Sequence, residues 1–311
     1  MPDLTGNRGV DVAGRYVTVV SRMPASRFAA VRDHAAPRPP PAAPVDRVVY
    51  GLTQPLVGAR TLIVHRDLLR AALVPAGLLA VFCAVIAVAG HRGSFLHRFY
   101  TTFAVLAPLP SIVLADHYAR LAAGARNALG FPRGEPCIEP LRRNLSRAIK
   151  QAILVALALA PISGLLDLVP GVGRMLVQVV AAVWALHWVV VEAFDGARVL
   201  RPGETLADLD AAALRVRLPW FVRWLHHAAE QVPVGGRLIG RFARLCDRLS
   251  LPWRDEIALV EDHPALMLGF ALSTAAVLAV PVLNLAFRPI VIVGACHVLG
   301  QLEAAAGHDG R

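Results

Sequence analysis

The chain has 311 residues, of which 56% are hydrophobic and only 17% are charged, and its mean hydropathy is +0.54. This balance argues against an ordinary soluble enzyme or a disordered protein. It indicates an integral membrane protein, with a very apolar soluble helical protein as the alternative. The net charge of +10 comes from basic residues spread over all the polar segments. Because they are not clustered with aromatic residues, nucleic acid is not the expected partner, and anionic lipid or an anionic solute is favoured.

The first 45 residues differ in composition from the rest of the chain. They are rich in arginine and alanine, end in a cluster of prolines over residues 39–44, and lack the apolar segment of a signal peptide. We predict a disordered cytoplasmic arm over residues 1–45 and a helical membrane domain over residues 46–310. After the arm, apolar residues recur at near-helical spacing over residues 48–63, which predicts an amphipathic helix at the membrane interface, bent at Pro55.

Two apolar segments in the first half of the domain are candidates to cross the bilayer. Residues 71–90 carry no charge, and about 20 helical residues are enough to span the hydrocarbon. Residues 99–115 form a second apolar segment, in which Pro108 and Pro110 predict a kinked or broken helix. A polar loop is expected to follow over residues 116–150.

The second half contains two apolar hairpins of similar plan. The first joins residues 151–166 to 175–191, and the second joins 264–280 to 288–302. In both, a proline ends one apolar run and an arginine begins the next, which is a weak internal repeat. A helix of 16 residues is only about 24 Å long, which is short of a hydrocarbon core of about 30 Å and favours partial insertion of the first hairpin. The candidate pathway or hairpin-tip residues are Pro170, Gly171, Gly173, Arg174, Asn284 and Arg288.

Together these segments predict an all-α polytopic membrane protein with two spanning helices and two helical hairpins. Interrupted hairpins in corresponding positions are typical of a transport pathway, whereas two ordinary hairpins with Pro/Gly turns explain the pattern equally well. Partial insertion and full crossing of the hairpins are both compatible with the sequence. Basic residues concentrate before the first span and in the long polar segments, so both termini are expected in the cytoplasm of a multi-pass inner (plasma) membrane protein.

Residues 212–251 form an inserted segment with the pattern of basic amphipathic helices. Apolar side chains at Leu238, Phe242, Leu245 and Leu249 recur at helical spacing, and arginines occupy the other side. Such helices are suited to lie on an anionic leaflet. The alternative is a small cytoplasmic helical hairpin that packs on itself.

No pattern in the sequence predicts a catalytic or metal centre. The four cysteines, Cys83, Cys137, Cys246 and Cys296, have neither the spacing of a zinc site nor that of a disulfide framework. No nucleotide or haem motif is present either. The expectation is a protein that is not an enzyme and that works without a cofactor.

Four segments of the sequence, in this order along the chain, are similar to segments of one known family. They are LDLVPGVG at residues 166–173, VEAFDGAR at 191–198, the run from Trp253 to Phe270, and VPVLNLAFRP at 280–289. As a set they resemble the CysZ and etoposide-induced-protein family of membrane proteins. The resemblance extends roughly from Val48 to Glu303.

The resemblance implies a compact helical inner-membrane fold with two spanning helices and two partly inserted hairpins, and it implies sulfate uptake. An early Gly-Leu-Arg motif of that family contributes to sulfate binding, and the matching stretch here is Gly58, Ala59 and Arg60. The resemblance therefore implies anion binding by Gly58 and Arg60. On physical grounds this requires a helix that begins or breaks there, and the alternative is an arginine that extends to the lipid headgroups.

The resulting prediction is an inner-membrane permease or channel for a small oxyanion such as sulfate. Because four short segments do not enclose a generous pore, we expect a homo-oligomer. The alternative is a non-transporting membrane scaffold or lipid-binding protein of the same fold, whose arginine-rich helices bind anionic lipid.

Overall fold

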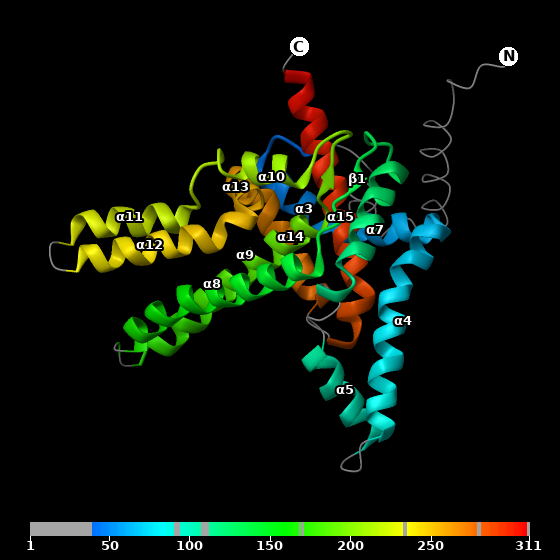
Figure 1. Ribbon diagram of the computed structural model, residues 1–311, viewed down its shortest axis with the longest axis horizontal. Helices are drawn as coiled ribbons and strands as arrows, with labels where there is room; N and C mark the ends of the chain where they lie inside the picture. The colour runs from blue at the N-terminus through cyan, green and yellow to red at the C-terminus, as the bar shows by residue number, and fades with distance from the viewer. Residues whose placement is uncertain are drawn as a thin grey trace.

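Most of the described chain is helical in the computed structural model (Figure 1). The structure describes residues 39–89, 94–106, 112–167, 169, 171–232, 235–278 and 281–309. Within these ranges three helices are long and apolar enough to cross a membrane: α4 (Arg66–Ala89), α9 (Gly173–Gly196) and the part Arg288–Ala306 of α15 (Pro281–Asp309). The predicted helical membrane protein is confirmed at this level. The predicted arm over residues 1–45 lies largely outside the described residues.

The helix α3 (Pro44–Val64) is central to the core, and α14 (Pro264–Leu278) and α15 pack against it. The helices approach closely because glycines face the neighbouring backbone. A Cβ atom at Gly51 would overlap the backbone oxygen of Leu266, and one at Gly269 would overlap that of Val48. The amphipathic helix predicted from the sequence is therefore present. The face that carries its buried residues packs on protein, whereas Leu52, Leu56 and Ile63 are exposed. Its location at the membrane interface stays a prediction.

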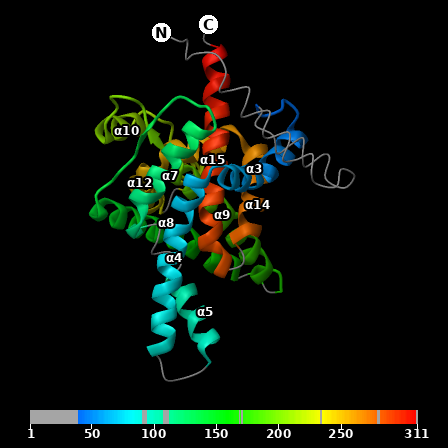
Figure 2. The ribbon, with the colours of Figure 1, turned by 90° about the vertical axis from the view of Figure 1, so that its right-hand side faces the viewer.

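The helices α4 and α5 (Phe95–Leu106) form a hairpin that extends away from this core (Figures 1 and 2). Large apolar side chains of α4 are more than half exposed, among them Val81, Phe82 and Val85. An apolar helix that exposes such side chains is suited to contact lipid. The first predicted span coincides with α4.

The second predicted span, residues 99–115, lies only partly within the described residues. The helix α5 has 12 residues, Pro108 and Pro110 lie outside the described residues, and α7 (Ala115–Ala128) begins where the span was expected to end. One face of α7 is buried against α15. The polar loop predicted over residues 116–150 is therefore wrong, because a polar sequence with one narrow apolar face forms a surface helix here.

The helices α8 (Leu141–Asp167) and α9 form the next hairpin, whose turn contains Gly171 in the left-handed conformation, with φ of 84°. Both helices continue well beyond the apolar runs from which they were predicted. With 24 residues α9 is about 36 Å long, so the prediction that this helix is short of the hydrocarbon core is wrong. Figure 1 shows that the hairpin runs across the direction of α4 and α15, not alongside them.

The last hairpin, α14 and α15, departs from the predicted repeat. The helix α15 begins at Pro281, so Arg288 lies about two turns inside it and Pro289 is an interior proline. In the first hairpin, by contrast, Arg174 is the second residue of α9. The two arginines therefore occupy different positions relative to their helix starts.

The segment between α9 and α14 adds a second hydrophobic core. It contains β2 (Val199–Leu200), which pairs with β1 (Glu135–Pro136), followed by α10 (Leu206–Ala213), α11 (Trp220–Gln231), α12 (Gly236–Ser250), η1 (Leu251–Trp253) and α13 (Arg254–Asp262). Trp184 and Trp188 of α9 pack with Phe221, Cys246 and Trp253 of this segment. The predicted pair of amphipathic helices is thus present as α11 and α12, and it shares its core with the α8–α9 hairpin.

Candidate functional site

A polar cavity of about 550 Å³ lies between α7, α8, α9 and α15, where the two hydrophobic cores meet. Its polar lining consists of Tyr118, Cys137, Glu139, Asn144, Arg147, Gln151, Glu192, Asp195, Arg198 and Arg288. Three of these are arginines and three are carboxylates, so their formal charges sum to zero. A cavity of this size lined by paired charges is uncommon within an apolar protein and is a candidate site for a polar solute.

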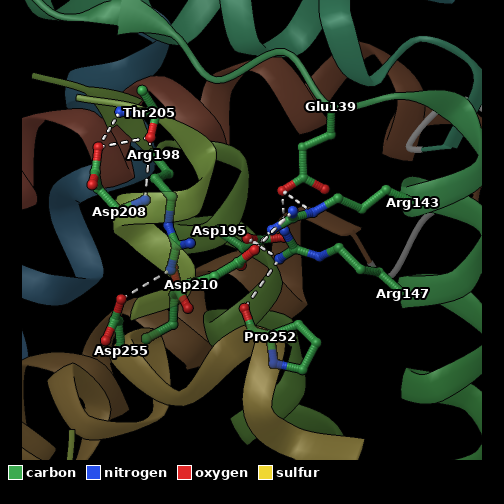
Figure 3. A network of polar contacts seen from close by, with 11 residues as sticks. Glu139, Arg143, Arg147, Asp195, Arg198, Thr205, Asp208, Asp210, Pro252 and Asp255 are labelled. Carbon is green, nitrogen blue, oxygen red and sulfur yellow. Dashed lines mark hydrogen bonds and ion pairs between the residues drawn. The ribbon is translucent and has the colours of Figure 1, made fainter. Parts of the chain in front are cut away.

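Arg147 of α8 is the centre of the polar network on one wall (Figure 3). Its Nη1 donates to Glu139 Oε1 at 2.9 Å, and its Nη2 pairs with Asp195 near the end of α9. Its guanidinium carbon lies 5.3 Å from the centre of the Trp253 ring. Since Arg147 and Glu139 are both almost fully buried, this pairing fixes the guanidinium at the cavity wall.

Arg143, one turn before Arg147, continues the network to the surface. Its two terminal nitrogens donate to the carboxylate of Asp210 at 3.0 and 2.6 Å, and its Nε lies 3.2 Å from Glu139 Oε1. Figure 3 shows the carboxylate of Glu139 directed toward the guanidinium groups of Arg143 and Arg147. The carboxylate of Glu139 therefore connects the cavity wall to α10 through Arg143.

Arg198, just after α9, forms the second arginine of the wall. Its Nη2 pairs with Glu256 and lies 3.5 Å from Asp255 Oδ2. Burial alone would lower the pKa of Arg198, but the carboxylates of Glu256, Asp195 and Asp255 raise it above its usual value. The guanidinium therefore stays charged. Burial raises the pKa of the Glu256 carboxyl, and Arg198 opposes that rise.

Arg288 of α15 is the third arginine of the lining. It pairs with Glu192 of α9, and its guanidinium carbon lies 5.8 Å from the centre of the Tyr118 ring. Its side chain is 19% exposed. An arginine at membrane depth is expected either to be paired or to line water, and Arg288 is both paired and at the cavity surface.

Two buried polar atoms at the lining have no hydrogen-bond partner among the described residues. They are the hydroxyl of Tyr118 and Oε2 of Glu139, on side chains of residues that are 4% and 7% exposed. A buried polar group without a partner is costly unless something else satisfies it. Burial raises the pKa of Tyr118, with Arg288 acting in the opposite direction, so the hydroxyl keeps its proton as a donor.

Cys137 contributes a thiol to the lining. Burial, followed by the negative charges of Glu139 and Asp195, raises its pKa to about 11. Because the thiolate is the reactive form, this cysteine is a poor nucleophile near neutral pH. It is useful instead as a reporter of access to the cavity.

The predicted anion-binding pair does not lie at this cavity. Gly58 is inside the continuous helix α3, and a Cβ atom there would overlap the backbone oxygen of Ile290 in α15. The backbone N–H of Gly58 is therefore not at a helix terminus, and the glycine permits close helix packing. Arg60 is half-buried on the same helix and is not part of the lining. Anion binding by Gly58 and Arg60 stays a prediction.

Of the hairpin residues whose side chains the structure describes, only Arg288 lines the cavity. Gly171 forms the α8–α9 turn, Gly173 is buried at the start of α9, and Arg174 is exposed beside it. Pro170 lies outside the described residues. Asn284 belongs to the first turns of α15, in a part whose side chains are not described.

Sequence reasoning missed most of the charged lining. Glu192, Asp195 and Arg198 are spaced three residues apart where the apolar run of α9 ends, which places charged side chains on one side of the helix end. That spacing was the available signal. Glu139 and Arg147 come from the segment predicted as a loop, and no local pattern there indicates that they meet.

No protein-family model, curated protein or solved structure matches this chain. The family resemblance therefore stays a prediction from the four sequence strings. The functional argument rests on the geometry of the cavity.

Proposed function

We propose that this chain is a multi-pass permease of the inner membrane, similar to the CysZ family, that binds a small oxyanion such as sulfate in the arginine-lined cavity. The observation that carries the proposal is the meeting of three arginines with the unpartnered hydroxyl of Tyr118 at one cavity. The guanidinium and hydroxyl groups at this cavity donate hydrogen bonds, and such donors can take the place of the water molecules that hydrate a sulfate ion.

The pairing of the arginines leaves donors for a solute. A guanidinium has five N–H donors, and the contacts of Arg288 with Glu192 and of Arg198 with its two carboxylates each use one terminal nitrogen. The remaining N–H groups are available to an oxyanion. A lining without net charge also suits transport, because a solute that crosses must bind strongly enough to enter and weakly enough to leave.

The proposed topology follows the direction of the helices. We place α4 and α15 as the two spanning helices and the α8–α9 hairpin as partly inserted, with both termini in the cytoplasm. Figure 1 supports this arrangement, since α4 and α15 run in a common direction that the α8–α9 hairpin crosses. The large exposed apolar surface of α4 suits lipid or a second copy in a homo-oligomer.

The test is uptake of radiolabelled sulfate into proteoliposomes that contain the purified protein. We expect saturable uptake that falls roughly tenfold in Arg288→Gln, because the change removes a charged hydrogen-bond donor from the cavity. Arg174→Gln is the matched control, since Arg174 is an exposed arginine outside the lining. Equal losses in both variants would contradict a role for the cavity.

A second candidate is a non-transporting scaffold or lipid-binding protein of the same fold. The observation that favours it is that each of the three lining arginines pairs with a carboxylate. Under this alternative the network only holds the helices together. Sulfate flux no higher than in empty liposomes, from protein shown to be folded, is the result that would favour it.

A further inference from the structure

The helix α12 carries a row of arginines that the structure leaves to the solvent. Arg237, Arg241, Arg244 and Arg248 recur at intervals of four, three and four residues, so they form one stripe along the helix. All four are exposed, and no ion pair or side-chain hydrogen bond connects any of them to another described residue. Other surface arginines of this region, such as Arg217 and Arg223, pair with carboxylates of α13.

Exposed apolar side chains lie directly beside this stripe. Leu238 and Leu245 are seven residues apart on the same side of α12 and are 71% and 44% exposed. On α11, Trp224 is 62% exposed and lies one turn after Trp220, whose ring packs on Trp184 of α9. The combination of arginines, leucines and an exposed tryptophan is typical of a helix at a lipid headgroup layer.

The inner side of α12 explains why the stripe faces outward. Gly240, Ala243 and Cys246 are buried, and Gly236 packs so closely on α11 that a Cβ atom would overlap the backbone oxygen of Ala229. The two helices therefore form a hairpin with one protein-facing and one open side. The alternative that this segment is packed entirely on itself leaves the arginines and leucines of the open side unexplained.

The α11–α12 hairpin is attached to an apolar hairpin that points the same way. Figure 1 shows α11–α12 and α8–α9 extending side by side from the core, and the ring of Phe221 contacts that of Trp184 across them. Near the free end of α9, Met175, Val179 and Val183 are each at least half exposed. If α8–α9 crossed the bilayer along its length, it would draw the arginine stripe into the hydrocarbon, which is strongly unfavourable.

We propose that the open side of α12 binds the anionic phospholipid headgroups of the leaflet that the α8–α9 hairpin enters. Charge complementarity identifies the partner, because four unpaired guanidinium groups match phosphate oxygens and the neighbouring leucines match the upper acyl chains. The α8–α9 hairpin then lies within one leaflet with α12 above it at the headgroups. This surface is separate from the arginine-lined cavity and does not depend on transport.

The experiment attaches a fluorophore at Leu238→Cys in the full-length protein, reconstituted in phosphatidylcholine nanodiscs. A small fixed fraction of lipid carries a nitroxide quencher on the upper acyl chain, with either a phosphatidylglycerol or a phosphatidylcholine headgroup. The native cysteines label slowly, since Cys83, Cys246 and Cys296 are buried and Cys137 is half-buried, and unsubstituted protein gives the background. Glu230→Cys, at an exposed acidic position on α11, is the matched control site.

We expect quenching at position 238 to be several-fold stronger with labelled phosphatidylglycerol than with labelled phosphatidylcholine. Changing the four stripe arginines together to Gln is expected to remove that preference. The fluorophore at position 238 should then be quenched equally and more weakly by both lipids, because the apolar side chains still contact the bilayer. Because no ion pair or side-chain hydrogen bond joins these four arginines to other described residues, the variant is expected to keep the elution profile of the parent protein. Position 230 is expected to be quenched little by either lipid.

Two outcomes would overturn the proposal. If the two lipids quench position 238 equally in the protein that keeps all four arginines, the anionic headgroup is not recognised. Absence of quenching by either lipid, with a fluorophore that is nevertheless shielded from aqueous iodide, would mean that protein covers this surface.

Discussion

At the scale of single residues, the cavity is organised by ion pairs, and several of them join parts of the chain that are distant in sequence. Arg147 joins α8 to the end of α9 through Asp195, and Arg288 joins α15 to α9 through Glu192. Removing one partner of a buried pair leaves an uncompensated charge, which is more costly than the pair itself is stabilising. The network is therefore expected to matter for stability as well as for binding.

The expected contribution to stability is clearest for Glu139. Glu139 accepts a hydrogen bond from Arg147 and forms an ion pair with Arg143, and its side chain is only 6% exposed. We predict that Glu139→Ala lowers the stability of the detergent-solubilised protein by roughly 3 kcal/mol, because Arg147 loses one of its two buried carboxylates. The measurement is the midpoint of thermal unfolding. Glu135→Ala, an exposed carboxylate in β1, is the control and should leave the midpoint within error.

Cys137 gives a prediction about pH. Its thiol has a pKa of about 11, raised by burial and then by Glu139 and Asp195. Because only the thiolate reacts, the rate of alkylation by N-ethylmaleimide should be slow at pH 7 and should rise about tenfold for each pH unit up to the region of the pKa. A rate that levels off below pH 9 would show that the thiol is not buried among these carboxylates.

Only part of this residue-level picture could be predicted from the sequence. Arg288 was identified because a single charge in an apolar run is conspicuous. Arg147 and Glu139 were not, since they lie in a polar segment where charges are ordinary. They become a site only when α8 is brought against the end of α9, where Asp195 lies. The Gly58–Arg60 pair had a local motif, but the sequence does not show that α15 occupies the face of α3 on which Gly58 lies.

At the scale of helices, the glycine crossings decide the packing of α3. Gly51 and Gly58 of α3 and Gly269 and Gly294 of the partner helices all face backbone atoms at the crossings. The sequence predicts the helix but not which of its faces packs on protein, because an amphipathic pattern does not distinguish lipid from protein as the apolar neighbour. For α7 the same pattern was too narrow to be noticed within a charged segment.

The crossing gives a prediction that separates packing from anion binding at Gly58. Gly58→Ala keeps the backbone N–H, so a role in donating that N–H to an anion would survive the change. The structure instead predicts a loss of stability of roughly 3 kcal/mol, since the new Cβ overlaps the Ile290 oxygen. The measurement is thermal unfolding in detergent. Gly77→Ala in α4 is the control, because nothing lies within 4 Å of its added Cβ, and its midpoint should not fall.

At the scale of the whole molecule, hydropathy identifies apolar helices but not their directions. Three described helices are long enough to cross, yet α9 runs across the direction shared by α4 and α15 (Figure 1). The length argument from the sequence failed because α8 and α9 extend beyond their apolar runs. Only the arrangement of the hairpins in space shows that one long apolar helix runs in a different direction from the other two.

The proposed topology predicts a pattern of labelling in intact cells. Single cysteines at Ser94, Arg174 and Arg215, all exposed, would be treated with a membrane-impermeant maleimide added from outside. We expect labelling at position 94, in the α4–α5 turn, and none at position 215, on the arginine-rich side. Position 174 should also be unlabelled, because a hairpin that stays within one leaflet does not reach the outer surface. Labelling at position 174 would mean that α8–α9 crosses.

The central claim is that an oxyanion occupies the arginine-lined cavity, and Cys137 in its wall allows the most direct test. The measurement is the rate of Cys137 alkylation at alkaline pH as a function of sulfate, with chloride added to keep the ionic strength constant. The account predicts a saturable decrease in rate that is lost in Arg288→Gln and kept in Arg174→Gln. An alkylation rate that is the same at every sulfate concentration would contradict it.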